Sequence, residues 1–500
     1  MSQSGTRISQ SNTSESAAAS TSKPRTPPTQ RWFPAKDRRW RSSALHALAC
    51  TRFPVSISGP HRCPMFALLD AHNFYASVEG DMRPALRSHP YVILSANDGA
   101  VVARSELARA LGVKMGEPWF KLKDLRELKG LMGLSANFTL YSDYSTRMHS
   151  LLAGLAEHTK PYSVDESFSY LGDMRGDHTE RVWRMRERVG QWLGLPMGGG
   201  IGKTLTLAKL ASHISKQAFR RPGTYPAELA HVCNLGQCAP SLLRDCMANT
   251  PVNEVWGIGR RYSAQLIDGG ILTALDLANM DAGTVRARWG VNMERTVREL
   301  NGIACIDVEG SSTRQQIMCS RSLAKPVESC HELQQLASLF ASNAARKLRQ
   351  QGSVSKAVSV FAMSSPFRDG PRFARSRVVP LARATDDSRK LCTAAAAGMR
   401  SIFEAGYDIV KVGVMLMDIS SREEAMAQGQ LLFDDCADVT NEGPLSSKEH
   451  ALMLAVDAVN ERYGRHCLRT ASTTVKSYSR QELRTPHYTT NLQDAPIARA

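Results

Sequence analysis

The sequence has 500 residues, of which 42% are hydrophobic and 22% charged, values typical of a soluble globular protein of about three domains. No apolar run approaches the ~18 residues of a membrane-spanning helix, which excludes an integral membrane protein. The 63 Lys and Arg outnumber the 47 Asp and Glu to give a formal charge of +16, so we expect a polyanionic partner.

The surplus charge is concentrated in two segments of different character. Residues 1–64 hold ten Lys or Arg and two acids, and residues 313–413 hold 16 Lys or Arg and seven acids. The first segment is rich in Ser, Thr and Pro without apolar periodicity, which predicts disorder. We expect a dispensable extension, because a buried-strand pattern begins directly after Met65. The second segment predicts a compact α/β domain with a basic face.

Apolar periodicity predicts an alternation of strands and helices. In chain order, the predicted elements are strands over Phe66–Asp70 and Tyr91–Ser95, a helix over Tyr144–Leu155, a hairpin over Pro161–Leu171, helices over Arg181–Leu193 and Leu205–Ser215, an all-helical region over 251–305, strands over Ala357–Met363 and Val410–Met417, and a helix over Glu449–Tyr463. The eleven cysteines are scattered without CxxC pairs. They predict reduced thiols rather than a zinc site.

Three carboxylates lie in or at the ends of predicted strands. Asp70 closes a buried strand, and Asp165 and Glu166 lie at the tip of the predicted hairpin. Buried carboxylates that converge repel one another unless cations lie between them, and Mg²⁺ prefers oxygen ligands of this kind. Two such ions would support in-line phosphoryl chemistry. The alternative is that Asp70 caps a turn while Asp165 and Glu166 face solvent.

A glycine-rich stretch, Gly199-Gly-Ile-Gly-Lys-Thr204, is similar to a phosphate-binding P-loop. The P-loop pattern G-x-x-x-x-G-K-[ST] requires its first glycine at position 197, which is Met197. The preceding segment reads as a polar helix and not as a buried strand. We therefore expect a glycine-rich connection between two helices, and no nucleotide-binding P-loop.

A second glycine motif, Gly257-Ile-Gly259, interrupts the helical region and is followed by Arg260 and Arg261. Two glycines around an apolar residue predict a tight hairpin with outward-facing N–H groups. Such groups bind phosphate without reading bases. Together with the arginines, the motif favours contact with a nucleic-acid backbone. A simple helix-capping turn is the alternative.

Five stretches in the same order resemble the Y-family translesion DNA polymerases, most closely the branch of bacterial DNA polymerase V catalytic subunits (UmuC). The stretches are Phe66–Ser77, Asn97–Arg104, Leu111–Lys121, Tyr162–Glu166 and Val255–Arg261. The resemblance implies an α+β multidomain fold, the right-hand polymerase. Its expected parts are a disordered extension (1–64), a ferredoxin-like palm (65–81 and 141–233), small fingers (82–140), a helical thumb with a helix-hairpin-helix (234–305), an α/β little finger (313–413) and a C-terminal tail (414–500).

The resemblance also implies an error-prone, template-directed DNA polymerase of the SOS response. Its expected residues are the ligands of two Mg²⁺ ions (Asp70, Asp165, Glu166 and the Ala71 carbonyl), a steric gate (Tyr75), further contacts to the incoming nucleotide (Arg104, Arg109 and Lys216), and contacts to the DNA backbone (Gly257, Gly259, Arg260 and Arg261). The ring of the steric gate would clash with a ribose 2′-hydroxyl, the group that distinguishes RNA from DNA.

Two positions depart from the family pattern. Glu106 replaces a tyrosine of many relatives, and Leu205 replaces a lysine for which the neighbouring Lys203 would compensate. The implied partners are primer–template DNA, dNTP, a UmuD-type accessory dimer, a recombinase filament and a sliding clamp. The clamp would bind Gln428, Leu431 and Phe433. The implied location is the cytoplasm, at the nucleoid, without a membrane. A non-catalytic DNA-binding module and a two-metal nuclease are the alternatives.

Overall fold

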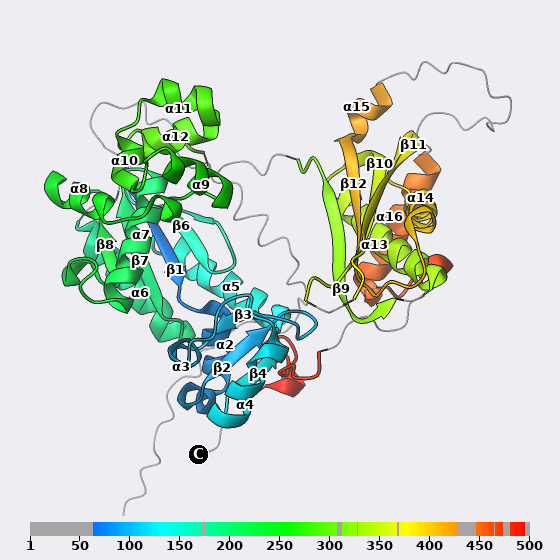
Figure 1. The fold of residues 1–500 in the computed structure, drawn as a ribbon, viewed down its shortest axis with the longest axis horizontal. Helices are drawn as coiled ribbons and strands as arrows, with labels where there is room; N and C mark the ends of the chain where they lie inside the picture. Colours follow the sequence, from blue (N-terminus) through cyan, green and yellow to red (C-terminus); the bar gives the residue numbers. More distant parts are fainter. Residues whose placement is uncertain are drawn as a thin grey trace, which may run out of the picture. The chain divides into compact units, whose positions relative to one another are not determined.

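The computed structural model describes residues 64–172, 174, 176–307, 313–327, 329–367, 370–427, 447–464, 466–473 and 481–495 (Figure 1). Residues 1–63, for which we expect a dispensable extension, lie outside these ranges. Within them, no helix is long and apolar enough to cross a membrane. All cysteines in these ranges are free thiols, as expected from their scattered positions.

A five-stranded sheet forms the centre of the N-terminal half of the described chain. Its strands, in spatial order, are β5 (His158–Pro161), β6 (Glu166–Tyr170), β1 (Phe66–Ala71), β7 (Met197–Gly202) and β8 (Val232–Asn234). Odd-numbered residues of β1 pack into the core cluster that also contains residues of α2 (Phe74–Met82), α5 (Phe138–Ala153) and α6 (His178–Leu193). Even-numbered residues face the cluster that contains residues of α7 (Leu205–Arg220). Asp70 is even-numbered, so the alternation of the strand turns it towards α7.

The glycine-rich stretch is a buried strand, so our prediction of a connection between two helices was wrong. All six residues of β7 are buried between β1 and β8. A Cβ atom on Gly200 would lie 2.0 Å from the Ser212 nitrogen, and one on Gly202 would lie 2.6 Å from the Ala208 nitrogen. Helix α7 therefore crosses this strand so closely that only glycine fits beneath it.

The N-terminus of α7 holds a buried carboxylate, Glu299, where a P-loop would hold phosphate. Glu299 lies on α12 (Val291–Leu300) and is fully buried. Its Oε2 atom accepts hydrogen bonds from the Thr206 nitrogen and hydroxyl, both at 2.8 Å. Its Oε1 atom accepts from the main-chain nitrogens of Cys305 at 3.2 Å and Ile306 at 2.9 Å. The chain's own carboxylate thus takes the anion position that a helix N-terminus offers.

We expect Glu299→Gln to lower the free energy of unfolding by about 2–3 kcal/mol. All four hydrogen bonds require an acceptor, and the amide NH₂ group of glutamine would face two donors instead. Urea unfolding measures the change. Glu180→Gln, at a side chain that is 60% exposed, is the control and should leave stability nearly unchanged. An equal effect of both substitutions would contradict this account.

A three-stranded sheet and a helical region complete this half of the described chain. The sheet has the order β3 (Val101–Arg104), β2 (Tyr91–Leu94) and β4 (Met132–Ser135), with β4 at an edge and parallel to β2. Two short helices, α3 (Glu106–Ala110) and α4 (Lys123–Lys129), accompany it. The helical region contains α8 (Pro240–Ala248), α9 (Arg260–Asp268), α10 (Ala274–Ala278), α11 (Ala282–Trp289) and α12, which confirms the predicted helical character of 251–305.

The C-terminal half contains a four-stranded antiparallel sheet. Its strands, in spatial order, are β11 (Ala374–Thr385), β10 (Ser353–Ser364), β12 (Ile409–Ser421) and β9 (Ile317–Val327). Helices α13 (Cys330–Gln350) and α14 (Ser388–Ile402) pack against it and share its core. After α15 (Arg422–Ala427), the helix α16 (Ser447–Tyr463) is attached to α13 by an ion pair between Asp457 and the buried Arg349 at 2.7 Å.

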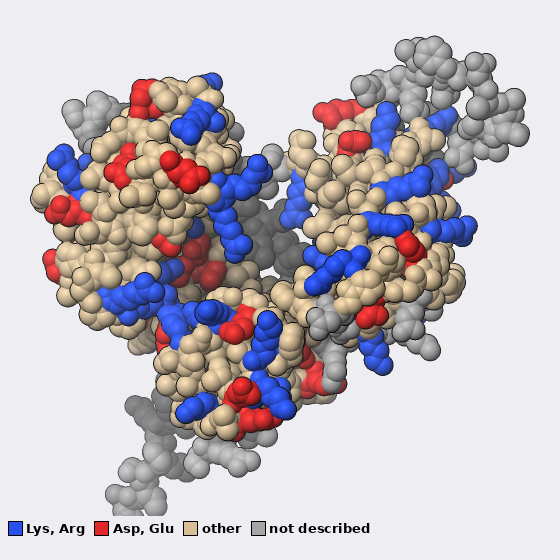
Figure 2. Space-filling model, in the orientation of Figure 1, with Lys and Arg blue, Asp and Glu red and all other residues tan. Residues whose placement is uncertain are grey.

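The predicted basic character of this half is visible on its surface. Figure 2 shows Lys and Arg side chains spread over it. Exposed examples on or beside strands β10 and β11 are Lys356, Arg372, Arg375 and Arg377. Strand β11 is an edge strand of the sheet, so its side chains and one row of its main-chain groups border solvent.

Candidate active site

Two carboxylates meet at the ends of neighbouring strands. The antiparallel register places Asp70 of β1 opposite Glu166 of β6, and their side chains share a hydrogen bond. Burial raises the pKa of Asp70 to about 7; the charge of Lys216 opposes this shift, and the bond to Glu166 adds to it. Burial acts in the same direction on Glu166, but the Asp70 bond and the charge of Lys209 outweigh it and lower its pKa. Two carboxylates this close repel each other when both are charged, so a cation between them would be stabilised.

Two lysines of α7 neutralise this pair. The Lys216 Nζ atom lies 2.7 Å from Asp70 Oδ2, and the Lys209 Nζ atom lies 3.0 Å from Glu166 Oε2. Lys209 also lies over the rings of Tyr162 and Trp256, with its Nζ atom 4.3 and 5.6 Å from their centroids. Lys216 was predicted at the site, whereas Lys209 was missed as a functional residue. Its spacing of seven from Lys216, two turns along a mostly buried helix, was a usable signal.

Asp165 lies next to Glu166 in the chain, but its carboxylate is bonded to Ser163 and not to the Asp70–Glu166 pair. Its side chain accepts a hydrogen bond from the Ser163 hydroxyl, and its carbonyl accepts one from the Ala71 nitrogen at 2.9 Å. In the part of the chain that the structure describes, no three acidic, His or Cys side chains form a group that could hold a metal. Asp70 and Glu166 therefore converge as predicted, while Asp165 would have to turn away from Ser163 to join them. The hard oxygen donors suit Mg²⁺.

Tyr75 forms part of an aromatic stack near the carboxylates. Its ring lies parallel to that of Tyr141, with centroids 4.4 Å apart and an angle of 17°. Phe138 meets it edge-on at 6.0 Å. Burial, and then the charge of Asp165, raise the pKa of Tyr75, so its hydroxyl stays neutral. The ring is thus held as a rigid wall near Asp165, a position that suits the predicted steric gate.

A polar cluster surrounds Glu106, one of the two departures from the family pattern. The Asn73 side-chain amide donates to Glu106 at 2.7 Å and accepts from Arg109 at 2.7 Å. Glu106 also pairs with Arg109 at 3.2 Å and with Arg220 at 3.8 Å. Burial, and then the charge of Arg109, lower the pKa of Arg220. Arg220 was not predicted, although it continues the charged face of α7 four residues beyond Lys216.

Arg104, also predicted to contact the nucleotide, has a different environment. It ends β3, and its guanidinium donates a hydrogen bond to the Val113 carbonyl. Its Nε atom is buried and has no partner among the described residues. The Nε atom of Arg109 is likewise buried without a partner among the described residues.

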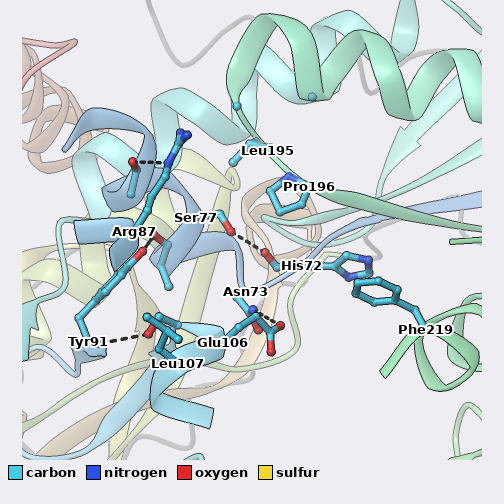
Figure 3. Close-up of a pocket in the computed structure, with 15 residues that line it drawn as sticks. His72, Asn73, Ser77, Arg87, Tyr91, Glu106, Leu107, Leu195, Pro196 and Phe219 are labelled. Atoms are coloured by element: carbon cyan, nitrogen blue, oxygen red, sulfur yellow. Dashed lines mark hydrogen bonds between the residues drawn. The ribbon is translucent and has the colours of Figure 1, made fainter. Parts of the chain in front are cut away.

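A cavity of about 570 Å³ lies next to this cluster (Figure 3). His72, Asn73, Glu106 and Phe219 contribute to its lining, and Figure 3 shows the His72 ring beside Phe219. Burial, followed by the charge of Arg220 and other nearby cations, lowers the pKa of His72 to about 3. His72 is therefore neutral near pH 7, and the positive charge beside the cavity comes from arginine and lysine.

The Gly-Ile-Gly motif begins α9. Gly257 has φ 90°, a left-handed conformation that favours glycine, and Ile258 is anchored in the helical core. Gly259 is the N-cap of α9, which no side chain of the described structure caps, and a Cβ atom on Gly259 would meet nothing within 4 Å. Arg260 and Arg261 are exposed. The start of α9 thus has no side-chain cap in the described structure, and contact of its N–H groups with a phosphate stays a prediction. The residues predicted to bind a sliding clamp lie outside the described part of the chain; they are Gln428, Leu431 and Phe433.

Comparisons with known proteins relate most of the chain to one family. Residues 69–213 match the impB/mucB/samB family, residues 314–431 match the C-terminal domain of that family, and residues 450–498 match a domain of unknown function, DUF4113. Protein MucB of Salmonella typhimurium is 38% identical over 443 residues, which cover 87% of this chain and 99% of MucB. Protein UmuC of the same species is 36% identical, with 86% of this chain and 99% of UmuC covered.

More distant similarities extend to other polymerases. A DNA polymerase IV of Oceanobacillus iheyensis is 25% identical, with 83% of this chain and 94% of that protein covered. Among solved structures, a Y-family DNA polymerase chimera superposes with a TM-score of 0.55 at 17% identity, over 71% of this chain and 99% of the chimera. At this identity the structural match establishes the fold.

Proposed function

Because this chain belongs to the impB/mucB/samB family of Y-family DNA polymerases, we propose that it copies damaged DNA with low fidelity in the SOS response. The observation that carries the proposal is the buried Asp70 facing the half-buried Glu166, beside the Tyr75 stack and the cations of α7. Primer extension on undamaged and abasic templates tests it. Binding of DNA without extension of either primer would refute it.

The proposed division into parts follows the resemblance. The five-stranded sheet corresponds to the palm, the three-stranded sheet to the fingers, the helical region to the thumb and the four-stranded sheet to the little finger. Small fingers enclose the nascent base pair loosely and therefore accommodate a damaged template base. Weaker closure around the substrate also weakens discrimination, which accounts for low fidelity.

In the proposed reaction, the primer 3′-hydroxyl attacks the α-phosphorus of the dNTP and pyrophosphate leaves. Asp70, Asp165 and Glu166, with the Ala71 carbonyl, would hold two Mg²⁺ ions. These ions would activate the attacking hydroxyl and neutralise the charge of the leaving group. Lys216, freed from Asp70, would bind the phosphates as a point charge.

The arginines near Glu106 would bind the same triphosphate. Arg109 and Arg220 share the Glu106 carboxylate, and a triphosphate is a stronger acceptor of the same kind. Glu106 would thus hold the two guanidinium groups in place until the nucleotide replaces it. Arg104 would add a third donor group.

Two alternatives belong to other classes. A non-catalytic DNA-binding module would have no need for two facing carboxylates, each paired with a lysine of α7, at the ends of neighbouring strands. A two-metal nuclease would leave the arginine cluster without a substrate group. An assay with labelled primer, with and without dNTP, separates polymerisation from degradation and from simple binding.

DNA binding is proposed to depend on the little finger and on the start of α9. The slope of log affinity against log salt falls by about one for each phosphate contact that is lost. We therefore expect Arg377→Gln to reduce this slope by about one. Removal of residues 1–64 should leave the slope nearly unchanged, although it removes half of the net charge. Fluorescence anisotropy on primer–template DNA at several salt concentrations measures both, and a large change on removal of 1–64 would contradict the assignment.

The partners that remain proposals are a sliding clamp, a UmuD-type accessory dimer and a recombinase filament. The clamp peptide would comprise Gln428, Leu431 and Phe433, since a short segment with apolar anchors suits docking in a groove. The proposed location is the cytoplasm, at the nucleoid.

A further inference from the structure

Residues 481–495, here called the C-terminal strap, lie against the edge of the three-stranded sheet. The Ser135 nitrogen of β4 donates to the Leu483 carbonyl at 3.0 Å, and the Leu483 nitrogen donates to the Ser135 hydroxyl at 3.1 Å. Ser135 and Arg484 form a parallel β-bridge. Figure 1 shows this segment beside β4. The strap thus pairs with a sheet edge that would otherwise be open.

A buried asparagine fixes the strap in register. Asn137 is fully buried at the N-cap of α5. Its side-chain nitrogen donates to the Thr485 carbonyl at 3.3 Å, the Thr485 hydroxyl at 3.1 Å and the Pro486 carbonyl at 2.9 Å. All its donor contacts among the described residues are therefore with the strap. Without the strap this buried amide would lose them, at a cost of about 1–3 kcal/mol.

The strap also reaches the aromatic stack through a buried carboxylate. The Thr485 hydroxyl, itself on a residue only 5% exposed, donates to Glu79 Oε1 at 3.0 Å. The same oxygen accepts a hydrogen bond from the Tyr141 hydroxyl at 2.9 Å. Glu79 is fully buried, and Tyr141 stacks on Tyr75. A continuous series of contacts thus runs from Thr485 through Glu79 and Tyr141 to Tyr75. Its two ends lie 410 positions apart in the sequence.

We propose that Thr485 is a positioning residue for sugar selection, which holds Tyr75 in place through the buried contacts between them. The Thr485 and Tyr141 hydroxyls share one acceptor oxygen, so each fixes the position of the other. Tyr141 in turn supports the face of Tyr75. The inference rests on the proposed role of Tyr75 as steric gate. It assigns a function to the strap, which is one part of the 450–498 match, whereas α16 in the same match pairs with α13.

Thr485→Val in the full chain tests this inference, since it keeps the shape of the side chain but removes its donor. The measured quantity is the ratio of kcat/KM for dNTP to kcat/KM for the matching rNTP. We expect this ratio to fall about tenfold, because residues of one hydrogen-bond network couple by amounts of this order. Thr485→Ser, which retains the hydroxyl, should restore the ratio. Thr490→Val, at an exposed threonine of the same strap, is the matched control.

A purely structural role would give a different pattern. A destabilised enzyme would lose activity towards dNTP and rNTP equally and leave their ratio unchanged, which would overturn the inference. If Thr485→Val does not fold, Tyr141→Phe cuts the same network from its other side and retains the ring stack. It should lower the ratio in the same way, and an unchanged ratio would again overturn the inference.

Failure of the inference can be told from failure of the proposed gate. Hydrogen exchange at the Ser135 amide, which is bonded to the strap, reports docking independently of activity. A protected amide with an unchanged ratio in Thr485→Val, while Tyr75→Ala alters the ratio, would overturn the positioning role and leave the gate standing. An unchanged ratio in Tyr75→Ala would overturn the gate, and the positioning role with it.

Discussion

Asp70→Asn is expected to reduce primer extension by about 1000-fold, the rate equivalent of several kcal/mol of lost charge stabilisation at the metal site. Asp70 is only 5% exposed and faces Glu166, so it stands at the point where the two carboxylates meet. An amide at this position still accepts hydrogen bonds but brings no negative charge to a cation. Single-turnover extension of a labelled primer at saturating dNTP measures the loss.

Folding and DNA binding should persist in this variant. The amide is neutral and removes a buried acid whose pKa burial has raised, so we expect no loss of stability from desolvation. Asp177→Asn is the control, since Asp177 caps α6 by accepting from the Thr179 nitrogen at 2.8 Å and asparagine caps equally well. Extension by Asp70→Asn at the rate of this control would show that Asp70 holds no catalytic metal.

Local patterns marked the two carboxylates as candidates, and the resemblance to the family was needed to choose a metal site over a turn cap and solvent-facing acids. The predicted strand Phe66–Asp70 is apolar up to Asp70, which singles out this carboxylate. The alternation of the predicted hairpin places Glu166 near the start of its second strand. Pairing of β1 with β6 then places them together. The side-chain direction of Asp165 could not be predicted in this way, because it depends on a turn in which the Ser163 hydroxyl competes for the carboxylate.

Other features depend on contacts between distant elements. Strand β7 contains four glycines and carries little hydrophobic signal, and its burial results from the close approach of α7. Lys209 and Arg220 acquire their roles from acids on β6 and α3. The bond from Thr485 to Glu79 spans 406 positions. Such pairs join distant segments, so the periodicity of one segment cannot predict them. The resemblance to the family located the site because it rests on several motifs in a fixed order along the chain.

Tyr75→Ala is expected to increase ribonucleotide insertion, relative to deoxyribonucleotide insertion, by about 100-fold, the order of discrimination that a pocket exerts against one added hydroxyl. The Tyr75 ring stacks on Tyr141 and meets Phe138 edge-on, so if Tyr75 is the proposed gate, the ring could not move away from a 2′-hydroxyl without breaking these contacts. Alanine removes this wall. Steady-state insertion of dNTP and rNTP opposite the same template base measures the ratio of the two kcat/KM values.

Tyr75→Phe separates the ring from its hydroxyl. If the wall acts by shape, phenylalanine should exclude ribonucleotides as tyrosine does, because the stack with Tyr141 needs only the ring. If phenylalanine admits ribonucleotides as alanine does, the hydroxyl selects the sugar and the steric account fails. If neither variant changes the ratio, the wall lies away from the sugar, and the burial of Tyr75 serves the core alone.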